Sequence, residues 1–471
     1  MPNILQFPIV LFGAIKAGLV VVNTNPLYTP HEMKHQFKDS GAKAIVILEN
    51  FCKNLESIID DTNIYTVITT KIGDQVGGFK GTIINTVIKH IKKMVPTFHL
   101  PQAISLKQIL SKSANKTPKA IDINRNDIAF LQYTGGTTGL SKGAQLSHSN
   151  IISNIMQCHA WIGNLFDHKG EIVITALPLY HIFALTINCM LFYTTGAKNI
   201  LVTNPRDMSG FLKILKKYPM NYITGVNTLY NGMLNHPEFK KLKFDQLKLS
   251  VGGGMSIQKV VADKWKSITG VDLLEGYGLS ETSPVASFAP LGGKHKIGFI
   301  GIPVPDTDMA IFDDQQNELP QGEHGEIGIK GPQVHQGYWN VGEENKKYFT
   351  ENGYFLTGDI GYMDEDFFFK IIDRKKEMIN VSGFNVYPNE VEKVISEHPK
   401  VLEVGVTGVE DKKSSELVAA FIVKKDPTLS ADEIKLLCKE KLTNYKIPKQ
   451  IHFREELPKS NVGKILRRKL K

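Results

Sequence analysis

The stretch Tyr133-Thr-Gly-Gly-Thr-Thr-Gly-Leu-Ser-Lys-Gly143 tells more about the fold than any other part of the sequence. Four glycines, three threonines and one lysine lie close together in it. Glycine lets backbone N–H groups turn inward, the hydroxyls add donors and the lysine adds positive charge, which together suit a polyphosphate. The spacing matches neither the Walker A loop nor the Rossmann Gly-x-Gly-x-x-Gly pattern. We therefore predict a phosphate loop of another kind, with a flexible surface loop as the alternative.

Length and composition narrow the class of protein. A chain of 471 residues has room for two or more domains, and 42% hydrophobic and 22% charged residues are ordinary for a globular protein. The cysteines are far apart in sequence, without a Cys-x-x-Cys pair, so we expect neither disulfides nor zinc and place the protein in the reducing cytoplasm. They are Cys52, Cys158, Cys189 and Cys438.

The net charge of +9 favours anionic partners. The basic residues are spread along the chain and no nucleic-acid-binding motif accompanies them, so we expect no nucleic acid. ATP, coenzyme A, a carboxylate substrate or an anionic membrane surface would each account for the charge.

Two apolar stretches, 4–22 and 172–193, are too interrupted by proline, glycine and polar residues to be membrane spans. In the first we predict a buried helix over 9–16, ended by Gly18, and a buried strand over 19–22. In the second we predict a core strand, a loop and a helix.

Short apolar segments alternate with helical ones along most of the chain, which predicts an α/β domain with largely parallel sheets. After Arg374 the pattern changes to a helix that opens at Pro388, two long strand-like segments and a capped helix over 434–442. We therefore predict a large domain over 1–373 and a small α+β domain over 374–471. The strand candidates in the large domain are Ala44–Leu48, Glu171–Leu177, Asn199–Thr203, Tyr222–Gly225, Leu247–Val251 and Val271–Leu274.

Six further motifs follow the phosphate loop. They are Leu177-Pro-Leu-Tyr-His181, Gly252-Gly-Gly-Met255, Tyr277-Gly-Leu-Ser-Glu-Thr282, Thr357-Gly-Asp359, Asp373-Arg-Lys-Lys376 and Pro458-Lys-Ser-Asn-Val-Gly-Lys464. In this order they resemble the acyl-adenylate-forming enzymes, and nearly the whole chain resembles the bacterial long-chain fatty-acid–CoA ligases. The resemblance implies a large multi-sheet adenylate-forming α/β N-terminal domain plus a small, mobile α+β C-terminal domain. It also implies that fatty acid, ATP and coenzyme A give acyl-CoA, AMP and pyrophosphate through an acyl-adenylate.

The resemblance assigns ATP binding to residues whose chemistry suits it. Glu281, assisted by Thr134, would hold Mg²⁺, which prefers carboxylate and phosphate oxygens. Tyr277 offers a flat face to adenine, while Asp359 and Arg374 would hydrogen-bond the ribose. Outside this setting they would be solvated, core or turn residues. The full set is Thr134, Gly135, Gly136, Thr137, Thr138, Gly139, Lys142, Gly276, Tyr277, Gly278, Glu281, Thr282, Asp359 and Arg374.

Lys464 is the predicted catalytic charge, because attack of a carboxylate on the α-phosphate brings two anions together and a fixed ammonium stabilises them. The alternative is a solvated lysine, since a basic tail with Arg467 and Arg468 follows it. The resemblance places His181 in an aromatic gate of the site. By itself, a histidine in an apolar run is more often a core residue.

The second half-reaction requires Lys464 to leave and a thiol to reach the acyl carbon. The resemblance makes Lys376 the hinge of the small domain, and assigns the pantetheine channel to Gly383, Phe384 and Asn385. For the acyl chain, we expect the small residues around 224–230 and 252–254 to leave a void.

The segment 83–95 is basic and amphipathic, with Ile84, Val87, Ile88, Ile91 and Val95 on one face. Such a segment would either rest on the anionic inner membrane or pack on its own domain. A homodimer is also compatible with the resemblance.

The family carries a segment before the part that aligns with Pro2, and we expect this chain to lack it. Three interpretations therefore stay open: a fatty-acyl-CoA ligase, an enzyme that transfers the acyl-adenylate to a carrier protein, and a truncated inactive remnant.

Overall fold

The computed structural model describes residues 1–134, 141–166, 170–382, 384–411, 414–460 and 463–471. These residues form two compact units. The first unit comprises Met1–Thr224, Gly278–Val285 and Pro332–Asn345, and the second comprises Gly225–Tyr277, Ala286–Gly331 and Lys346–Lys471. The domain boundary between residues 373 and 374 stays a prediction.

The first unit contains parallel strands joined by helices, as the alternating pattern predicts. β1 pairs with β5 in parallel and β5 with β6 antiparallel, β2–β3–β4 form a parallel sheet, and β7 pairs in parallel with both β8 and β9. The strands are β1 (Val21–Val22), β2 (Ala44–Leu48), β3 (Thr66–Thr70), β4 (Ile104–Ser105), β5 (Ile128–Thr134), β6 (Lys142–Ser147), β7 (Ile172–Thr175), β8 (Lys198–Leu201) and β9 (Tyr222–Gly225).

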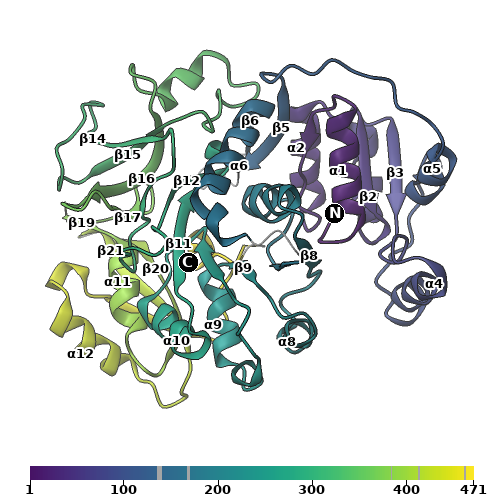
Figure 1. The fold of residues 1–471 in the computed structure, drawn as a ribbon. Helices are drawn as coiled ribbons and strands as arrows, with labels where there is room; N and C mark the ends of the chain where they lie inside the picture. Colours follow the sequence, from purple (N-terminus) through teal and green to yellow (C-terminus); the bar gives the residue numbers. More distant parts are fainter. Residues whose placement is uncertain (135–140, 167–169, 383, 412–413, 461–462) are drawn as a thin grey trace. The chain divides into compact units, whose positions relative to one another are not determined.

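Helices of the first unit begin where side chains cap free backbone N–H groups. Thr29 and Ser147 each form a capping box, ahead of α2 and α6. In Figure 1, α5 lies beside β3, which it contacts. The helices are α1 (Gln6–Lys16), α2 (Pro30–Ser40), α3 (Cys52–Glu56), α4 (Gly78–Thr86), α5 (Leu106–Ser113), α6 (His148–Ile162), α7 (Phe192–Thr194), α8 (Met208–Lys217) and the π-helices η3 (Val87–Ile91) and η5 (Ala184–Leu191).

The first apolar stretch is less buried than we predicted. α1 begins at Gln6 and buries one side only, since Ile9 is exposed. Leu19 and Val20 are also exposed, and the strand is limited to the two residues of β1. The prediction of a buried strand was wrong because β1 pairs only through two residues with β5, at the edge of its sheet.

The second apolar stretch is a core element, as predicted. It forms β7 and then η5, every residue of which is buried. Among the described residues, no helix is both long and apolar enough to cross a membrane.

The second unit departs from the largely parallel pairing. β10 and β11 pair in parallel, but β12–β13 and the four strands β14–β17 pair antiparallel. β10 and β11 also continue beyond Val251 and Leu274, where we predicted these strands to end, and include the glycines that follow. The strands are β10 (Leu249–Gly253), β11 (Leu273–Gly278), β12 (Val285–Phe288), β13 (Ile302–Pro303), β14 (Asp308–Phe312), β15 (Gly325–Lys330), β16 (Phe355–Met363) and β17 (Phe369–Arg374).

The C-terminal part of the second unit has the predicted α+β character. β20 and β21 pair antiparallel, β18 and β22 pair with β21, and the buried sides of α11 and α12 join the same core. Ser430 forms the predicted capping box with Glu433 at the start of α12. The elements of this part are β18 (Ile379–Val381), β19 (Phe384–Val386), α11 (Pro388–Ser396), β20 (Val401–Asp411), β21 (Ser415–Lys424), α12 (Ala431–Lys441) and β22 (Gln450–Arg454). The second unit also contains the earlier helices α9 (Asn227–Asn235) and α10 (Lys259–Thr269).

Candidate active site

Three of the predicted nucleotide-binding residues meet in the second unit. The Tyr277 hydroxyl donates to Oδ2 of Asp359 at 2.7 Å, and Nε of Arg374 lies 2.8 Å from Oδ1 of the same carboxylate. Asp359 is buried, whereas the Arg374 side chain is 38% exposed. Both carboxylate oxygens are thus engaged, and each still has a lone pair for a further donor.

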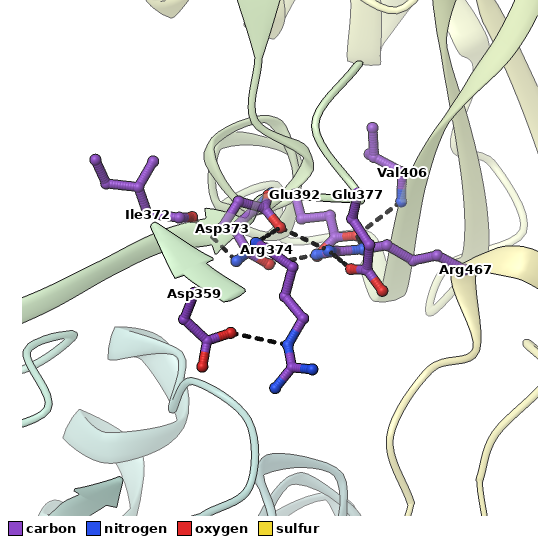
Figure 2. Close-up of polar contacts among 9 residues, drawn as sticks. Asp359, Ile372, Asp373, Arg374, Glu377, Glu392, Val406 and Arg467 are labelled. Atoms are coloured by element: carbon purple, nitrogen blue, oxygen red, sulfur yellow. Dashed lines mark hydrogen bonds and ion pairs between the residues drawn. The ribbon is translucent and has the colours of Figure 1, made fainter. Parts of the chain in front are cut away.

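Strand register brings these residues together. Asp359 on β16 stands opposite Arg374 on β17, and a register shift follows between Ile360 and Gly361. Figure 2 shows the Arg374 side chain directed to Asp359. Burial, and next the Asp359 carboxylate, raise the pKa of Tyr277, so its hydroxyl stays protonated and keeps donating. The two contacts together hold the Asp359 carboxylate in one orientation.

The loop before Lys464 is held at several points in the second unit. Gly463 has a φ of 83°, which favours glycine, and its carbonyl accepts from the Thr228 hydroxyl at 3.1 Å. The Lys464 amide donates to the Ser460 hydroxyl at 3.1 Å. Cε of Lys464 lies 3.3 Å from where a Cβ on Gly254 would stand. The lysine stem therefore passes close over the backbone of Gly254, and Lys464 is half-buried rather than part of an open basic tail.

The small residues expected to leave a void for the acyl chain are instead covered by neighbouring side chains. A Cβ on Gly252 would lie 2.3 Å from Cδ1 of Ile257, and one on Gly225 would lie 2.9 Å from the Tyr230 ring. Tyr230 is fully buried and donates to the Val251 carbonyl at 2.8 Å. At Gly225 and Gly252 the expectation of a void was wrong, because a neighbouring side chain fills the space beside each glycine.

The predicted hinge lies in an exposed turn. Lys376 sits between β17 and β18, and the Glu377 amide closes the turn by donating to the Arg374 carbonyl at 2.9 Å. Phe384 and Asn385 on β19 are both exposed, and the Phe384 ring stacks on Tyr445 at 4.9 Å. Gly383 lies outside the described residues.

A second group of predicted residues meets in the first unit, around Tyr338. Its hydroxyl donates to Oε1 of Glu281 at 2.7 Å, and Nζ of Lys142 lies 5.7 Å from its ring centroid. Lys142 stands opposite Thr134 in the β5–β6 pair, and the Trp339 amide donates to the Gly143 carbonyl at 2.8 Å. The predicted magnesium ligand and the lysine at the end of the phosphate loop therefore both lie against one aromatic residue.

The motif around Tyr277 needs its glycines for close packing. A Cβ on Gly278 would lie 1.8 Å from the Pro284 carbonyl oxygen, and one on Gly276 would lie 2.8 Å from the Phe288 ring. Thr282 is fully buried, and its hydroxyl accepts from the Leu279 amide at 2.9 Å. These contacts shape the turn that presents Glu281.

The remaining predicted residues are less informative. His181 is half-buried just before η5, and its Nδ1 lies 3.5 Å from the Phe183 amide. Five residues of the predicted phosphate loop lie outside the described residues: Gly135, Gly136, Thr137, Thr138 and Gly139.

The described ranges contain no cluster of three or more histidine, cysteine, aspartate or glutamate residues fit to hold an ion. Mg²⁺ is commonly bound by one or two carboxylates together with substrate phosphates, so a single buried Glu281 fits such an ion when it arrives with ATP.

Sequence analysis missed three residues around these groups. Tyr338 bridges Lys142 and Glu281, and its only sequence signal is the Gly337-Tyr-Trp cluster. The Arg467 side chain is only 12% exposed and is therefore not part of a solvated tail. Glu275, two residues before Tyr277 on β11, is buried with no hydrogen-bond partner for Oε2 in the described part of the chain, and burial raises its pKa to about 8.

The chain belongs to the family of AMP-binding enzymes. The family model for AMP-binding enzymes matches residues 1–339 of the sequence, and the family model for their C-terminal domain matches residues 390–464. The chain is similar to the long-chain-fatty-acid–CoA ligase of Escherichia coli, with 52% identity over all of this chain and 84% of that protein. Its counterpart from Haemophilus influenzae is 50% identical with the same coverage.

Solved structures of other enzymes have the same fold as this chain. ATP-bound MatB from Rhodopseudomonas palustris superposes with a TM-score of 0.82 at 27% identity, over 98% of this chain and 85% of that one. The resemblance read from the motifs is confirmed. The fold class is confirmed too, with a large multi-sheet α/β domain and a smaller C-terminal domain.

Proposed function

We propose that this protein is an ATP-dependent long-chain fatty-acid–CoA ligase. The observation that carries the proposal is the 52% identity to such a ligase over the whole of this chain. The fatty-acid carboxylate attacks the α-phosphate of ATP and displaces pyrophosphate. The thiol of coenzyme A then attacks the acyl carbon, forms the thioester and displaces AMP.

The two groups of residues supply the chemistry that the first step needs. Asp359 and Arg374 bind the ribose, and Gly276, Tyr277 and Gly278 take the adenine. The phosphate loop and Lys142 bind the phosphates, while Glu281 and Thr134 hold the Mg²⁺ that accompanies them. Lys464 stabilises the charge that develops on the α-phosphate.

The second step uses the C-terminal residues. Lys376 is the hinge on which the segment carrying Lys464 moves, and Gly383, Phe384 and Asn385 line the path of the pantetheine arm. The exposed turn at Lys376 supports a hinge there, because a turn between two strands can absorb a change in backbone dihedral angles. His181 belongs to the gate of the acyl site.

The first test is product analysis of the purified chain with ATP, magnesium, coenzyme A and palmitate. We expect palmitoyl-CoA and AMP by mass spectrometry, and neither without magnesium. Release of ADP would contradict the proposal, and acylation of a carrier protein in preference to coenzyme A would favour the carrier-transfer function. A cooperative thermal transition raised by ATP and magnesium would exclude the inactive remnant.

We also propose that this cytoplasmic enzyme contacts the inner membrane through the predicted segment 83–95, together with the exposed residues just before it. Four residues of the predicted apolar face, Ile84, Val87, Ile88 and Val95, are half-buried, so this face packs largely on its own unit. The fifth residue of that face, Ile91, is 70% exposed, and three apolar residues outside the face are exposed too, namely Phe79 at 80%, Ile83 at 44% and Met94 at 53%. The lysines among them, Lys80, Lys89, Lys92 and Lys93, are exposed as well.

Changing Lys89, Lys92 and Lys93 together to glutamate is expected to weaken binding to phosphatidylglycerol vesicles by roughly tenfold or more, since each basic residue near such a surface contributes about 1 kcal/mol. Vesicle co-sedimentation measures this. The control changes the exposed lysines 213, 216 and 217 of α8 to glutamate, which alters the net charge equally. Equal losses in both variants would remove the proposal. A homodimer stays a prediction, which light scattering would test.

A further inference from the structure

The guanidinium of Arg467, in the 3-10 helix η10 (Arg467–Lys469), lies among three carboxylates (Figure 2). Nη1 lies 3.0 Å from Asp373 and 2.5 Å from Glu377. Nε and Nη2 bind both oxygens of Glu392 at 2.9 and 2.7 Å, and Nη2 also donates to Oδ1 of Asn389. The Arg467 side chain is only 12% exposed, while its neighbours Arg468 and Lys469 are exposed.

This cluster depends on its one guanidinium. The Asp373 side chain is fully buried, and burial raises its pKa to about 6, although Arg467 and two backbone N–H donors favour the charged form. Removing one partner of a buried ion pair leaves a charge uncompensated, which costs far more than the loss of a surface pair. The planar guanidinium also donates to several acceptors at once, so a lysine ammonium would restore only part of these contacts.

The partners of Arg467 come from both sides of the exposed turn at Lys376. Asp373 precedes the turn and lies on β17, which pairs with β16, and its neighbour Arg374 binds Asp359. Glu377 follows the turn, and Glu392 lies on α11. Arg467 itself comes three residues after Lys464. The guanidinium therefore ties the segment that carries Lys464 to the end of β17.

A second contact strengthens the same junction. The Asn389 amide donates to Oδ2 of Asp373 at 2.7 Å, and its side-chain Nδ2 donates to the Ile372 carbonyl at 3.0 Å. Glu392 is in turn fixed by the Val406 amide, which donates to Oε1 at 2.7 Å. Asp373 is thus the shared acceptor for Arg467 and Asn389 across the turn.

We propose that Arg467 is a positioning residue for acyl-adenylate formation, and that its contact with Asp373 latches the Lys464 segment in the arrangement seen here. The proposal rests on the proposed function, in which Lys464 acts in the first half-reaction. The contacts of Arg467 with Glu377, Asn389 and Glu392 all lie beyond the turn and would travel with it if the segment moves about Lys376. The contact with Asp373 spans the turn and would have to break.

The latch predicts unequal effects on the two half-reactions. Arg467→Met removes the guanidinium from a side chain of similar reach, and Asp373→Asn removes one charge at constant volume. Both are expected to lower kcat for palmitate-dependent pyrophosphate release about tenfold or more, with KM for ATP changed less than threefold. Conversion of supplied palmitoyl-AMP to palmitoyl-CoA should stay within twofold. Arg467→Lys should recover part of the loss.

The experiment measures both half-reactions with the full chain, and Arg468→Met serves as the matched control at an exposed neighbour. Equal loss of both half-reactions in Asp373→Asn would overturn the latch, and so would an unchanged rate of pyrophosphate release. If Arg467→Met fails to fold, Asp373→Asn carries the test. Wild type and Lys464→Ala are measured in the same assays, so that the two proposals are tested separately. Absence of palmitoyl-AMP in wild type contradicts the proposed function. The relative loss of the two half-reactions in Arg467→Met and Asp373→Asn tests the role of Arg467.

Discussion

Replacing Lys464 with alanine is expected to slow acyl-adenylate formation by about 100- to 1,000-fold, the usual cost of removing one fixed group that stabilises transition-state charge. Thr228 and Ser460 hold the loop that precedes this lysine, and its stem passes over Gly254. Alanine removes the ammonium without disturbing these backbone contacts, so the loss should fall on chemistry and not on folding.

The measurement compares pyrophosphate release with the conversion of supplied palmitoyl-AMP to palmitoyl-CoA. Lys464→Ala should leave the second reaction within a few-fold of wild type. A bulky residue at Gly383 should have the opposite effect, with adenylation retained and thiolation lost. If both variants lost the same half-reaction, the assignment of separate residues to the two steps would be wrong.

Replacing Glu275 with glutamine is expected to stabilise the protein at pH 8 while changing little at pH 5. Burial raises the pKa of Glu275 from its ordinary value of 4.5 to about 8. The folded carboxyl therefore keeps its proton up to about pH 8, whereas the unfolded one loses it above about 4.5. The folded state loses stability as pH rises through this window, by at most about 5 kcal/mol.

Glutamine imitates the protonated carboxyl, so this variant should lack that part of the pH dependence. Urea unfolding at pH 5, 6, 7 and 8 measures the free energy of unfolding of wild type and variant. Glu365→Gln, at an exposed position, is the control and should follow wild type. An identical pH dependence in wild type and Glu275→Gln would mean that Glu275 is ionised in the folded protein.

Local patterns predicted the elements that local chemistry determines. The capping box at Ser430 and the helix that opens at Pro388 were read correctly because each depends on residues within one or two turns. The continuation of β10 through Gly252 and Gly253 was missed, because glycine weakens a strand locally and pairing with β11 overrides it.

In the candidate site too, short motifs identified single residues but not the contacts between residues far apart in sequence. The motifs identified Asp359 and Arg374, but the hydroxyl of Tyr277 on Asp359 depends on a contact between residues 82 apart. Likewise, Arg467 looked like one charge in a basic tail because its carboxylate partners lie 75 to 94 residues earlier. Burial of a charge follows from tertiary packing, which no short pattern contains.

The last two residues of β17 face opposite ways, since side chains alternate along a strand. Arg374 meets Asp359, and Asp373 meets Arg467. Inserting a single residue within 369–372 would set the Asp373 carboxylate against Asp359, and deleting one would bury the Arg374 guanidinium beside Arg467. In the evolution of this enzyme, insertions and deletions should therefore be confined to the turn before β17. A single-residue insertion or deletion in the strand should abolish activity even where the sheet still folds.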